Sequence, residues 1–85
     1  MNEPRQHILK CWPEFFQAVK DGSKTFEVRK DDGRGFAVGD QLLLQEYIPC
    51  DEGEGTYTGR ELDVVVTYLL RGPPFLPEGM VAMSI

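Results

Sequence analysis

The sequence lacks a long hydrophobic run. In its 85 residues, no apolar stretch approaches the roughly 18 residues that a membrane-spanning helix needs. Residues 1–5 are not followed by the apolar segment of a signal peptide. We therefore expect a cytoplasmic protein with no membrane partner. The length suits one hydrophobic core, so we expect a single domain over residues 1–85.

Cysteine and histidine are scarce as well. The two cysteines, Cys11 and Cys50, lack the CxxC spacing of a zinc site, and His7 is the sole histidine. The acidic segment 51–54 lacks the spaced ligands of a calcium loop. We therefore expect no metal and no cofactor, two reduced thiols, a structural role for His7 and a solvated acidic turn.

The chain also lacks an excess of positive charge. Its net charge of −5 argues against a protein that coats nucleic acid through many phosphate contacts. The charges are unevenly distributed, however. Residues 1–34 hold seven Lys/Arg against six Asp/Glu, whereas residues 35–85 hold two against eight. An anionic ligand is therefore expected to dock on the first part of the chain.

The first 22 residues predict a strand and a helix. Residues 5–11 alternate loosely and form a segment too short for a helix. Pro13 fits the first turn of a helix, and Gly22 suits the left-handed residue that ends it. One face of this helix is apolar at helical spacing, through Phe15, Phe16 and Val19.

The next segment, residues 24–29, alternates strictly and predicts a second strand. We expect Phe26 and Val28 to face the core. Thr25, Glu27 and Arg29 then share the opposite, open face, because side chains alternate along a strand.

The remaining sequence predicts further strands joined by turns. Residues 38–40 form a turn before an apolar, buried strand at 41–47, and Thr58-Gly59 marks the tip of another turn. The β-branched run at 61–70 predicts a central strand, and residues 80–85 predict the last one. The fold class is therefore α+β: a small curved or barrel-like mixed β-sheet of five or six strands, with one helix after the first strand.

The segment from Gly22 to Arg29 fits the pattern G-x-K-x-x-E-x-R. In this motif, and in the order of the elements around it, the chain resembles the ASCH domain family of the PUA-like superfamily. The resemblance covers nearly the whole chain. It implies a barrel-like sheet with a cleft beside the motif that binds RNA or a modified, nucleotide-like small molecule.

The resemblance also implies a catalytic alternative. Some ASCH proteins hydrolyse acylated cytidine, and ribonuclease activity is attributed to the family. In the hydrolase branch a nucleophilic threonine follows the lysine by three positions, but here Glu27 follows Lys24. A carboxylate in place of a hydroxyl nucleophile changes the class of reaction. If the protein is an enzyme, Lys24 and Glu27 are its expected catalytic acid/base pair.

The candidate ligand-binding residues of the motif are Lys24, Thr25, Glu27 and Arg29. Glu27 and Arg29 lie two positions apart on a strand, close enough for a surface ion pair or for joint contact with one ligand. Lys24 is either a phosphate contact or an ordinary solvated lysine.

Outside the motif, Lys10 and Trp12 offer a charge and a stacking surface to a base. Trp12 has a second interpretation, as a core anchor against Phe16. Tyr68 is a further candidate for the site, although tyrosines on strands usually pack their rings.

Three functions thus remain open from the sequence. The first is a binding module for RNA or a modified nucleotide. The second is a small hydrolase acting on an acylated nucleoside or an RNA phosphodiester. The third is a protein-interaction module, because a small acidic domain also suits a protein partner.

Overall fold

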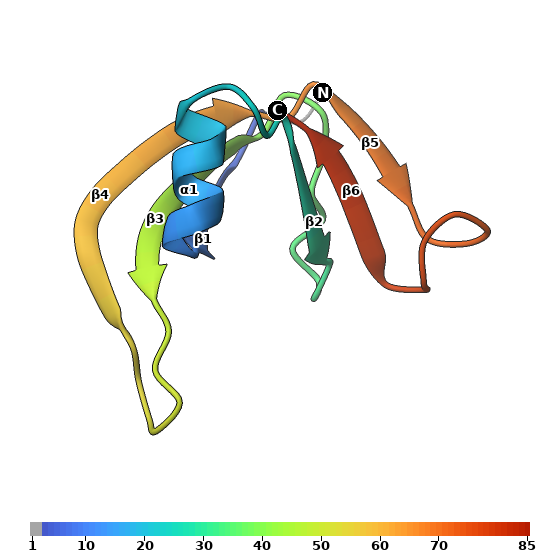
Figure 1. Ribbon diagram of the computed structural model, residues 1–85. Helices are drawn as coiled ribbons and strands as arrows, with labels where there is room; N and C mark the ends of the chain where they lie inside the picture. Colours follow the sequence, from blue (N-terminus) through green and yellow to red (C-terminus); the bar gives the residue numbers. More distant parts are fainter. Residues whose placement is uncertain (1–2) are drawn as a thin grey trace.

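The computed structural model describes residues 3–85, which form six strands and one short helix. The strands form two separate three-stranded sheets. In Figure 1 the two sheets spread apart from one end of the molecule, where the C-terminus lies. The elements in chain order are β1 (Gln6–Cys11), α1 (Pro13–Lys20), β2 (Phe26–Lys30), β3 (Gln41–Ile48), β4 (Thr56–Val65), β5 (Tyr68–Arg71) and β6 (Met80–Ser84).

The first sheet, sheet A, has the strand order β1-β3-β4. β1 runs parallel to β3, and β3 runs antiparallel to β4. Alternate residues of β1 and β3 are buried, as expected for strands with one covered face. The helix α1 packs against β3 (Figure 1) and buries Phe16 and Val19. Its last turn is followed by Gly22 with a φ of 83°, which is the conformation that favours glycine after a helix.

The second sheet, sheet B, has the strand order β2-β6-β5 and is antiparallel throughout. β6 is therefore its central strand, although it is the last in sequence. Met83 and Val81 of β6 are almost completely buried. They join the core formed by sheet A and α1, in which the largest buried side chains are Phe16, Phe36, Leu42 and Leu44.

Backbone hydrogen bonds tie the two sheets together at the end where they converge. The Val66 amide donates to the carbonyl of Asp40, and the next amide, of Thr67, donates to Ser84. The Ile85 amide donates to the carbonyl of Thr25. These bonds fix the start of β2 against the end of β6, which positions the motif strand.

The prediction of one central strand over residues 61–70 is wrong. β4 ends at Val65, β5 begins at Tyr68, and each lies at the edge of a different sheet. The chain changes sheet between Val66 and Thr67. The buried Val66 still bonds to Asp40, just before β3, whereas the Thr67 amide bonds to Ser84 of β6. Local β propensity predicted the strands but does not contain this tertiary contact.

The predicted turn at Thr58-Gly59 is also wrong. Both residues lie within β4, beside a shift in register between Gln45 and Tyr47 of β3. Gly59 has a φ of 93°, so it supplies the left-handed residue that such irregularities often need. The strand continues through it.

The α+β class and the six strands agree with the sequence prediction, whereas the barrel does not. The two sheets of residues 3–85 do not close into a barrel. Over the same residues, the single helix α1 is too short and too polar to cross a membrane.

Candidate functional site

The motif strand β2 has its faces reversed relative to the prediction. Glu27 is only 4% exposed, whereas Phe26 and Val28 are 51% and 43% exposed. Glu27 pairs with the buried Met83 of β6 and shares its face. Hydrophobic alternation alone assigned Phe26 and Val28 to the core. Lys24 and Arg29 neutralise the Glu27 carboxylate. The side of the strand that carries Glu27 is therefore buried, and the side that carries Phe26 and Val28 is exposed.

A cleft of about 310 Å³ opens beside this strand. It brings together the exit of β1, the start of α1 and the motif. Its volume is at the lower end of the range for small-molecule sites, about 300–1,000 Å³, and suits a group the size of one nucleobase. The residues that line it are Lys10, Cys11, Trp12, Phe15, Lys24, Phe26, Glu27, Val28 and Arg29.

Glu27 is held between two cations on one of its two oxygens. Its Oε2 lies 3.3 Å from Lys24 Nζ and 3.4 Å from Arg29 Nε. Its Oε1 is buried and accepts no hydrogen bond from any group within residues 3–85. A buried acceptor without a partner destabilises a protein by about 1–3 kcal/mol. Half of this carboxylate therefore has unused capacity to accept a hydrogen bond.

The two cations are themselves fixed by backbone carbonyls. Lys24 Nζ donates to the carbonyl of Phe26 at 2.6 Å, and Arg29 Nη2 donates to the carbonyl of Lys10 at 2.9 Å. The second contact joins β2 to the exit of β1. Because a lysine has three donors and an arginine five, each cation keeps donor groups for a ligand.

Aromatic side chains form another part of the cleft. The rings of Trp12 and Phe15 stack with their centroids 6.2 Å apart, and Trp12 is half exposed. Trp12 is therefore not the predicted core anchor against Phe16, because it is half exposed whereas Phe16 is buried. The Lys24 ammonium lies 4.9 Å from the centroid of the exposed Phe26 ring, close enough for a cation–π contact.

Cys11 is a buried free thiol in the same cleft. Burial and the nearby Glu27 charge raise the pKa of its thiol, against the lowering effect of Arg29 and Lys24. A raised pKa disfavours the thiolate that acts as a nucleophile. Cys11 therefore lines the cleft as a neutral thiol.

Five of the seven predicted ligand-binding residues line this one cleft: Lys10, Trp12, Lys24, Glu27 and Arg29. Lys10 turns its ammonium toward the ring of Tyr47, 4.6 Å from the centroid. Thr25 precedes β2 and Tyr68 lies on β5, and neither is among the lining residues. The predicted catalytic pair, Lys24 and Glu27, is in direct contact.

Sequence reasoning did not identify four lining residues, Cys11, Phe15, Phe26 and Val28. The sequence does contain a pattern that could have identified Phe26 and Val28. An acidic residue with a lysine three positions before it and an arginine two positions after it can be buried as a neutralised group. That burial turns the neighbouring apolar residues outward.

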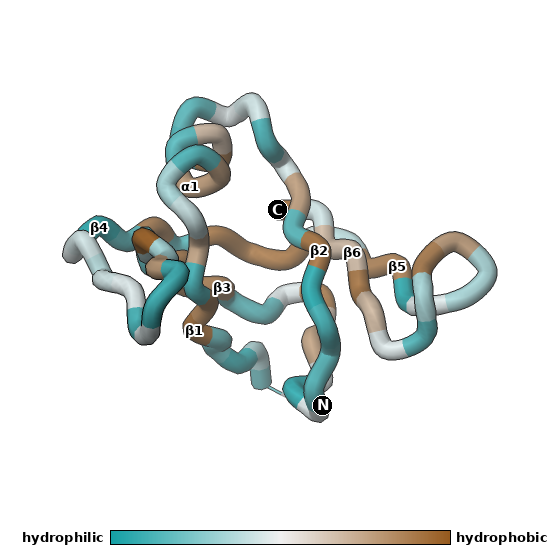
Figure 2. Tube along the Cα trace, turned by 60° about the horizontal axis from the view of Figure 1, so that its bottom comes forward, coloured by the Kyte–Doolittle hydropathy of each residue, from teal (hydrophilic) through white to brown (hydrophobic). Residues whose placement is uncertain are grey.

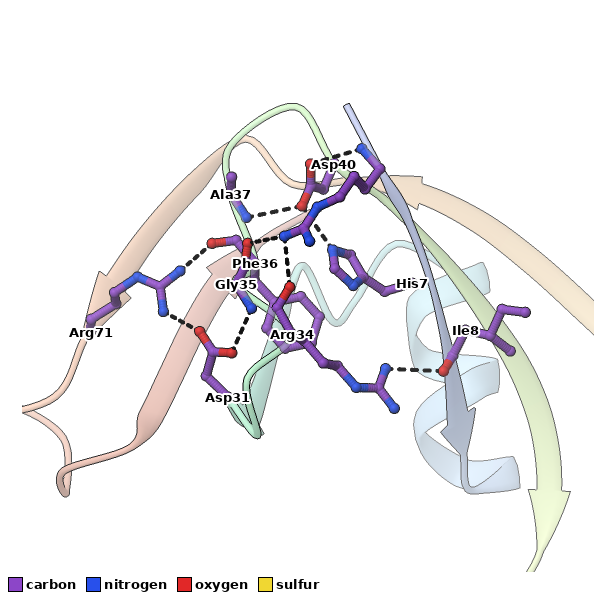
Figure 3. Close-up of polar contacts among 10 residues, drawn as sticks. His7, Ile8, Asp31, Arg34, Gly35, Phe36, Ala37, Asp40 and Arg71 are labelled. Carbon is purple, nitrogen blue, oxygen red and sulfur yellow. Dashed lines mark hydrogen bonds and ion pairs between the residues drawn. The ribbon is translucent and has the colours of Figure 1, made fainter. Parts of the chain in front are cut away.

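A second buried carboxylate, Asp40, lies at the end where the sheets converge (Figure 3). His7 Nε2 is 2.7 Å from Asp40 Oδ2, and the amides of Arg5 and Ala37 donate to the carboxylate at 3.1 Å each. Burial by itself would raise the pKa of Asp40, but these hydrogen bonds outweigh it and lower the pKa below 3.8. Asp40 thus joins β1 to the turn before β3, which agrees with a structural role for His7.

Arg71 extends this cluster toward sheet B. Its guanidinium bonds to Asp31 and to the carbonyl of Phe36 (Figure 3). The hydrogen bond from Arg71 lowers the pKa of Asp31. These contacts anchor the loop between β2 and β3. The charge of Arg71 is therefore paired inside the protein.

Within residues 3–85, no group of three or more histidine, cysteine, aspartate or glutamate side chains is arranged to hold a metal ion. The side chains that line the cleft offer one carboxylate acceptor, three cationic groups, a thiol and aromatic faces.

Comparison with known proteins identifies a protein family and a similar phage protein. A protein of Escherichia phage P2, described as "Uncharacterized 12.9 kDa protein in GpA 3'region", is 34% identical over 61 residues. The similar region covers 72% of this chain and 50% of the phage protein, so the chain matches about half the length of that relative. Residues 6–85 match the family described as "Domain of unknown function (DUF3850)". Because the match covers nearly all of the sequence, the chain belongs to this family.

Proposed function

We propose that this protein binds RNA or a nucleotide-like small molecule in the cleft beside β2, as an ASCH-type domain of the PUA-like superfamily. The observation that carries the proposal is the buried carboxylate of Glu27, with one oxygen paired to two cations and the other without a partner. A ligand that donates an N–H or O–H group to Oε1 relieves this unsatisfied acceptor.

The other groups of the cleft match the remaining parts of a nucleotide. Lys24 and Arg29 provide positive charge for a phosphate or a base carbonyl. The exposed rings of Trp12 and Phe15 provide a face on which a base can stack. The sequence motif G-x-K-x-x-E-x-R supports the same assignment, because its lysine, glutamate and arginine all lie in the cleft.

Binding requires one side chain to move. Oε1 of Glu27 is enclosed, so we propose that a neighbouring side chain moves before the ligand's donor group reaches it. Lys24 is the candidate, because it contacts the same carboxylate through Oε2. Lysine side chains carry high rotamer freedom and are held here by few contacts. The ligand's hydrogen bonds then replace those that Lys24 gives up.

A panel of nucleosides, ribonucleoside monophosphates and oligoribonucleotides, followed by NMR chemical-shift perturbation, tests the proposal. We expect shifts at residues 24–29 and at the Trp12 indole. Arg29→Lys keeps the charge but loses the planar fork, so binding should weaken by about 1–3 kcal/mol. Lys20→Ala, on the exposed end of α1, is the matched control and should bind normally. Perturbation confined to another surface would place the site elsewhere.

The contact between Lys24 and Glu27 favours a second candidate function, hydrolysis of an acylated nucleoside or an RNA phosphodiester. Their charged atoms are 3.3 Å apart, within reach for proton exchange between an acid and a base. Turnover of acetylcytidine or RNA that disappears in both Lys24→Ala and Glu27→Gln would support this role. Turnover that persists in Lys24→Ala would exclude the pair as the catalytic machinery.

A further inference from the structure

One face of sheet B is exposed and apolar. In an antiparallel sheet, directly paired residues project from the same face. The register places Phe26 opposite Ser84 and Ser84 opposite Tyr68; the next row on that face is Val28, Ala82 and Leu70. We call these two rows the open face of sheet B.

The side chains of these two rows are highly exposed, although most of them are apolar. Tyr68 is 68% exposed and Leu70 is 42% exposed on the edge strand β5. Phe26 and Val28 have comparable exposure at the opposite edge, on β2. In Figure 2 the middle of β5 and much of β6 are coloured hydrophobic, and β6 also carries the buried Val81 and Met83 on its other face. Contiguous apolar surface of this kind marks a site of interaction.

The open face is continuous with the cleft, because Phe26 and Val28 belong to both. The cleft has room for about one base. A longer ligand that enters it would therefore leave across β2 and meet β6 and then β5.

The charge of the open face is unlike that of the whole chain. The sequence holds 14 Asp+Glu against nine Lys+Arg, yet no carboxylate within residues 3–85 belongs to either row. Lys24 lies just before β2 with its ammonium over Phe26, and Lys30 ends β2 in the next row, opposite Met80. An acidic protein thus presents an uncharged face with lysines at both ends of β2. Such a face complements a polyanion that carries apolar bases.

We propose that the open face of sheet B is a stacking platform for single-stranded RNA, one base of which occupies the cleft. This proposal rests on the proposed function of the cleft. Phe26 and Tyr68 are separated by one intervening strand, or about 10 Å, so each ring accepts a different base. Stacking on exposed aromatic side chains is how single-stranded nucleic acid is commonly held. A duplex does not present its base faces in this way.

Comparing ligands of different length tests the platform. The probes are the four ribonucleoside monophosphates and single-stranded oligoribonucleotides of increasing length, measured by fluorescence anisotropy and NMR. We expect affinity to rise with length, and Tyr68→Ala to weaken oligonucleotide binding about tenfold or more while leaving monophosphate binding unchanged. Tyr68→Phe keeps the ring and should bind as the original protein does.

Tyr57→Ala is the matched control, since Tyr57 is a half-exposed tyrosine on β4 of sheet A. Its oligonucleotide affinity should not change. Thermal melts of all three variants show whether folding is intact. A tenfold loss in Tyr68→Ala with an intact fold and normal monophosphate binding supports the platform.

Four results would overturn the proposal. If oligonucleotides bind no more tightly than monophosphates, or if Tyr68→Ala and Tyr57→Ala behave alike, the platform is wrong while the cleft assignment stands. If no probe binds at all, the proposed function fails and the platform fails with it. Concentration-dependent dimerisation that Tyr68→Ala abolishes would assign the open face to a second copy of the chain.

Discussion

Asp40 and Glu27, two of the three buried carboxylates within residues 3–85, have opposite hydrogen-bonding environments. Asp40 receives three contacts, from one side chain and two backbone amides, spread over both of its oxygens. Glu27 receives two longer contacts from cations on one oxygen, and its other oxygen is unpartnered within residues 3–85. A satisfied buried charge stabilises a fold, whereas a half-satisfied one lowers stability and is available to a ligand. The comparison therefore separates a structural carboxylate from a candidate functional one.

The largest expected effect is at the satisfied carboxylate. Asp40→Asn replaces one acceptor oxygen with a donor amide that faces the Ala37 amide and His7. We expect the free energy of unfolding to fall by about 3 kcal/mol, measured by urea denaturation. NMR shifts at residues 24–29 should stay in place in the folded variant. A loss below about 1 kcal/mol would mean that the Asp40 side chain does not fasten β1 to the turn before β3.

The isosteric change at the other carboxylate should affect stability much less. Glu27→Gln removes a charge whose burial was only partly compensated, so we expect a change in unfolding free energy within about 1 kcal/mol. Ligand binding should weaken, because a neutral amide accepts hydrogen bonds less strongly than a carboxylate. The same urea titrations serve for both variants. Equal destabilisation by the two substitutions would remove the distinction between the carboxylates.

Acidification should sharpen the comparison further. The pKa of Asp40 is lowered below its usual value of 3.8, so the folded state holds the ionised form more strongly than the unfolded state. This contribution is fully present above the unfolded pKa and is lost as the pH falls through the folded pKa. The difference in unfolding free energy between the original protein and Asp40→Asn should therefore shrink below about pH 4. A difference that is constant from neutral pH to pH 2 would contradict the lowered pKa.

The smallest expected effect concerns the thiols. Cys11 is buried with a raised pKa, whereas Cys50 is exposed. Alkylation with iodoacetamide, followed by mass spectrometry, should modify Cys50 first. The rate at Cys11 should be lower by a factor of about ten or more. Cys50→Ser provides a protein in which the cleft thiol is followed alone. Rapid alkylation of Cys11 would show that the cleft opens far more readily than its contacts indicate.

Much of the fold follows from local sequence. Pro13 and Gly22 bound the helix, and the apolar run at 41–47 forms the buried strand β3. Features that depend on contacts between distant residues do not follow. The break after Val65 depends on a hydrogen bond from Thr67 to Ser84, and the separation into two sheets depends on the pairing of β2 with β6. Neither contact leaves a pattern in the segment that it shapes.

The sequence predicted which motif residues lie together in the candidate site, but not which face of their strand is buried. Residues of one motif converge because a short strand holds them together, so Lys24, Glu27 and Arg29 meet as expected. Alternation fixes which residues share a face but not which face is buried. Ion pairing decided that question at β2, in favour of Glu27 over Phe26.

The pairing of the second strand with the last one has a consequence for folding kinetics. β2 has its only strand partner among the described residues in β6, 50 or more positions later. Loop closure of that length must be completed before β2 gains any hydrogen bonds to another strand, whereas β5 and β6 pair locally. Proteins with such distant contacts fold more slowly than those built from local ones. We therefore expect sheet A, α1 and the β5–β6 pair to acquire protection from hydrogen exchange before β2 does, and the cleft to be completed in the final step of folding.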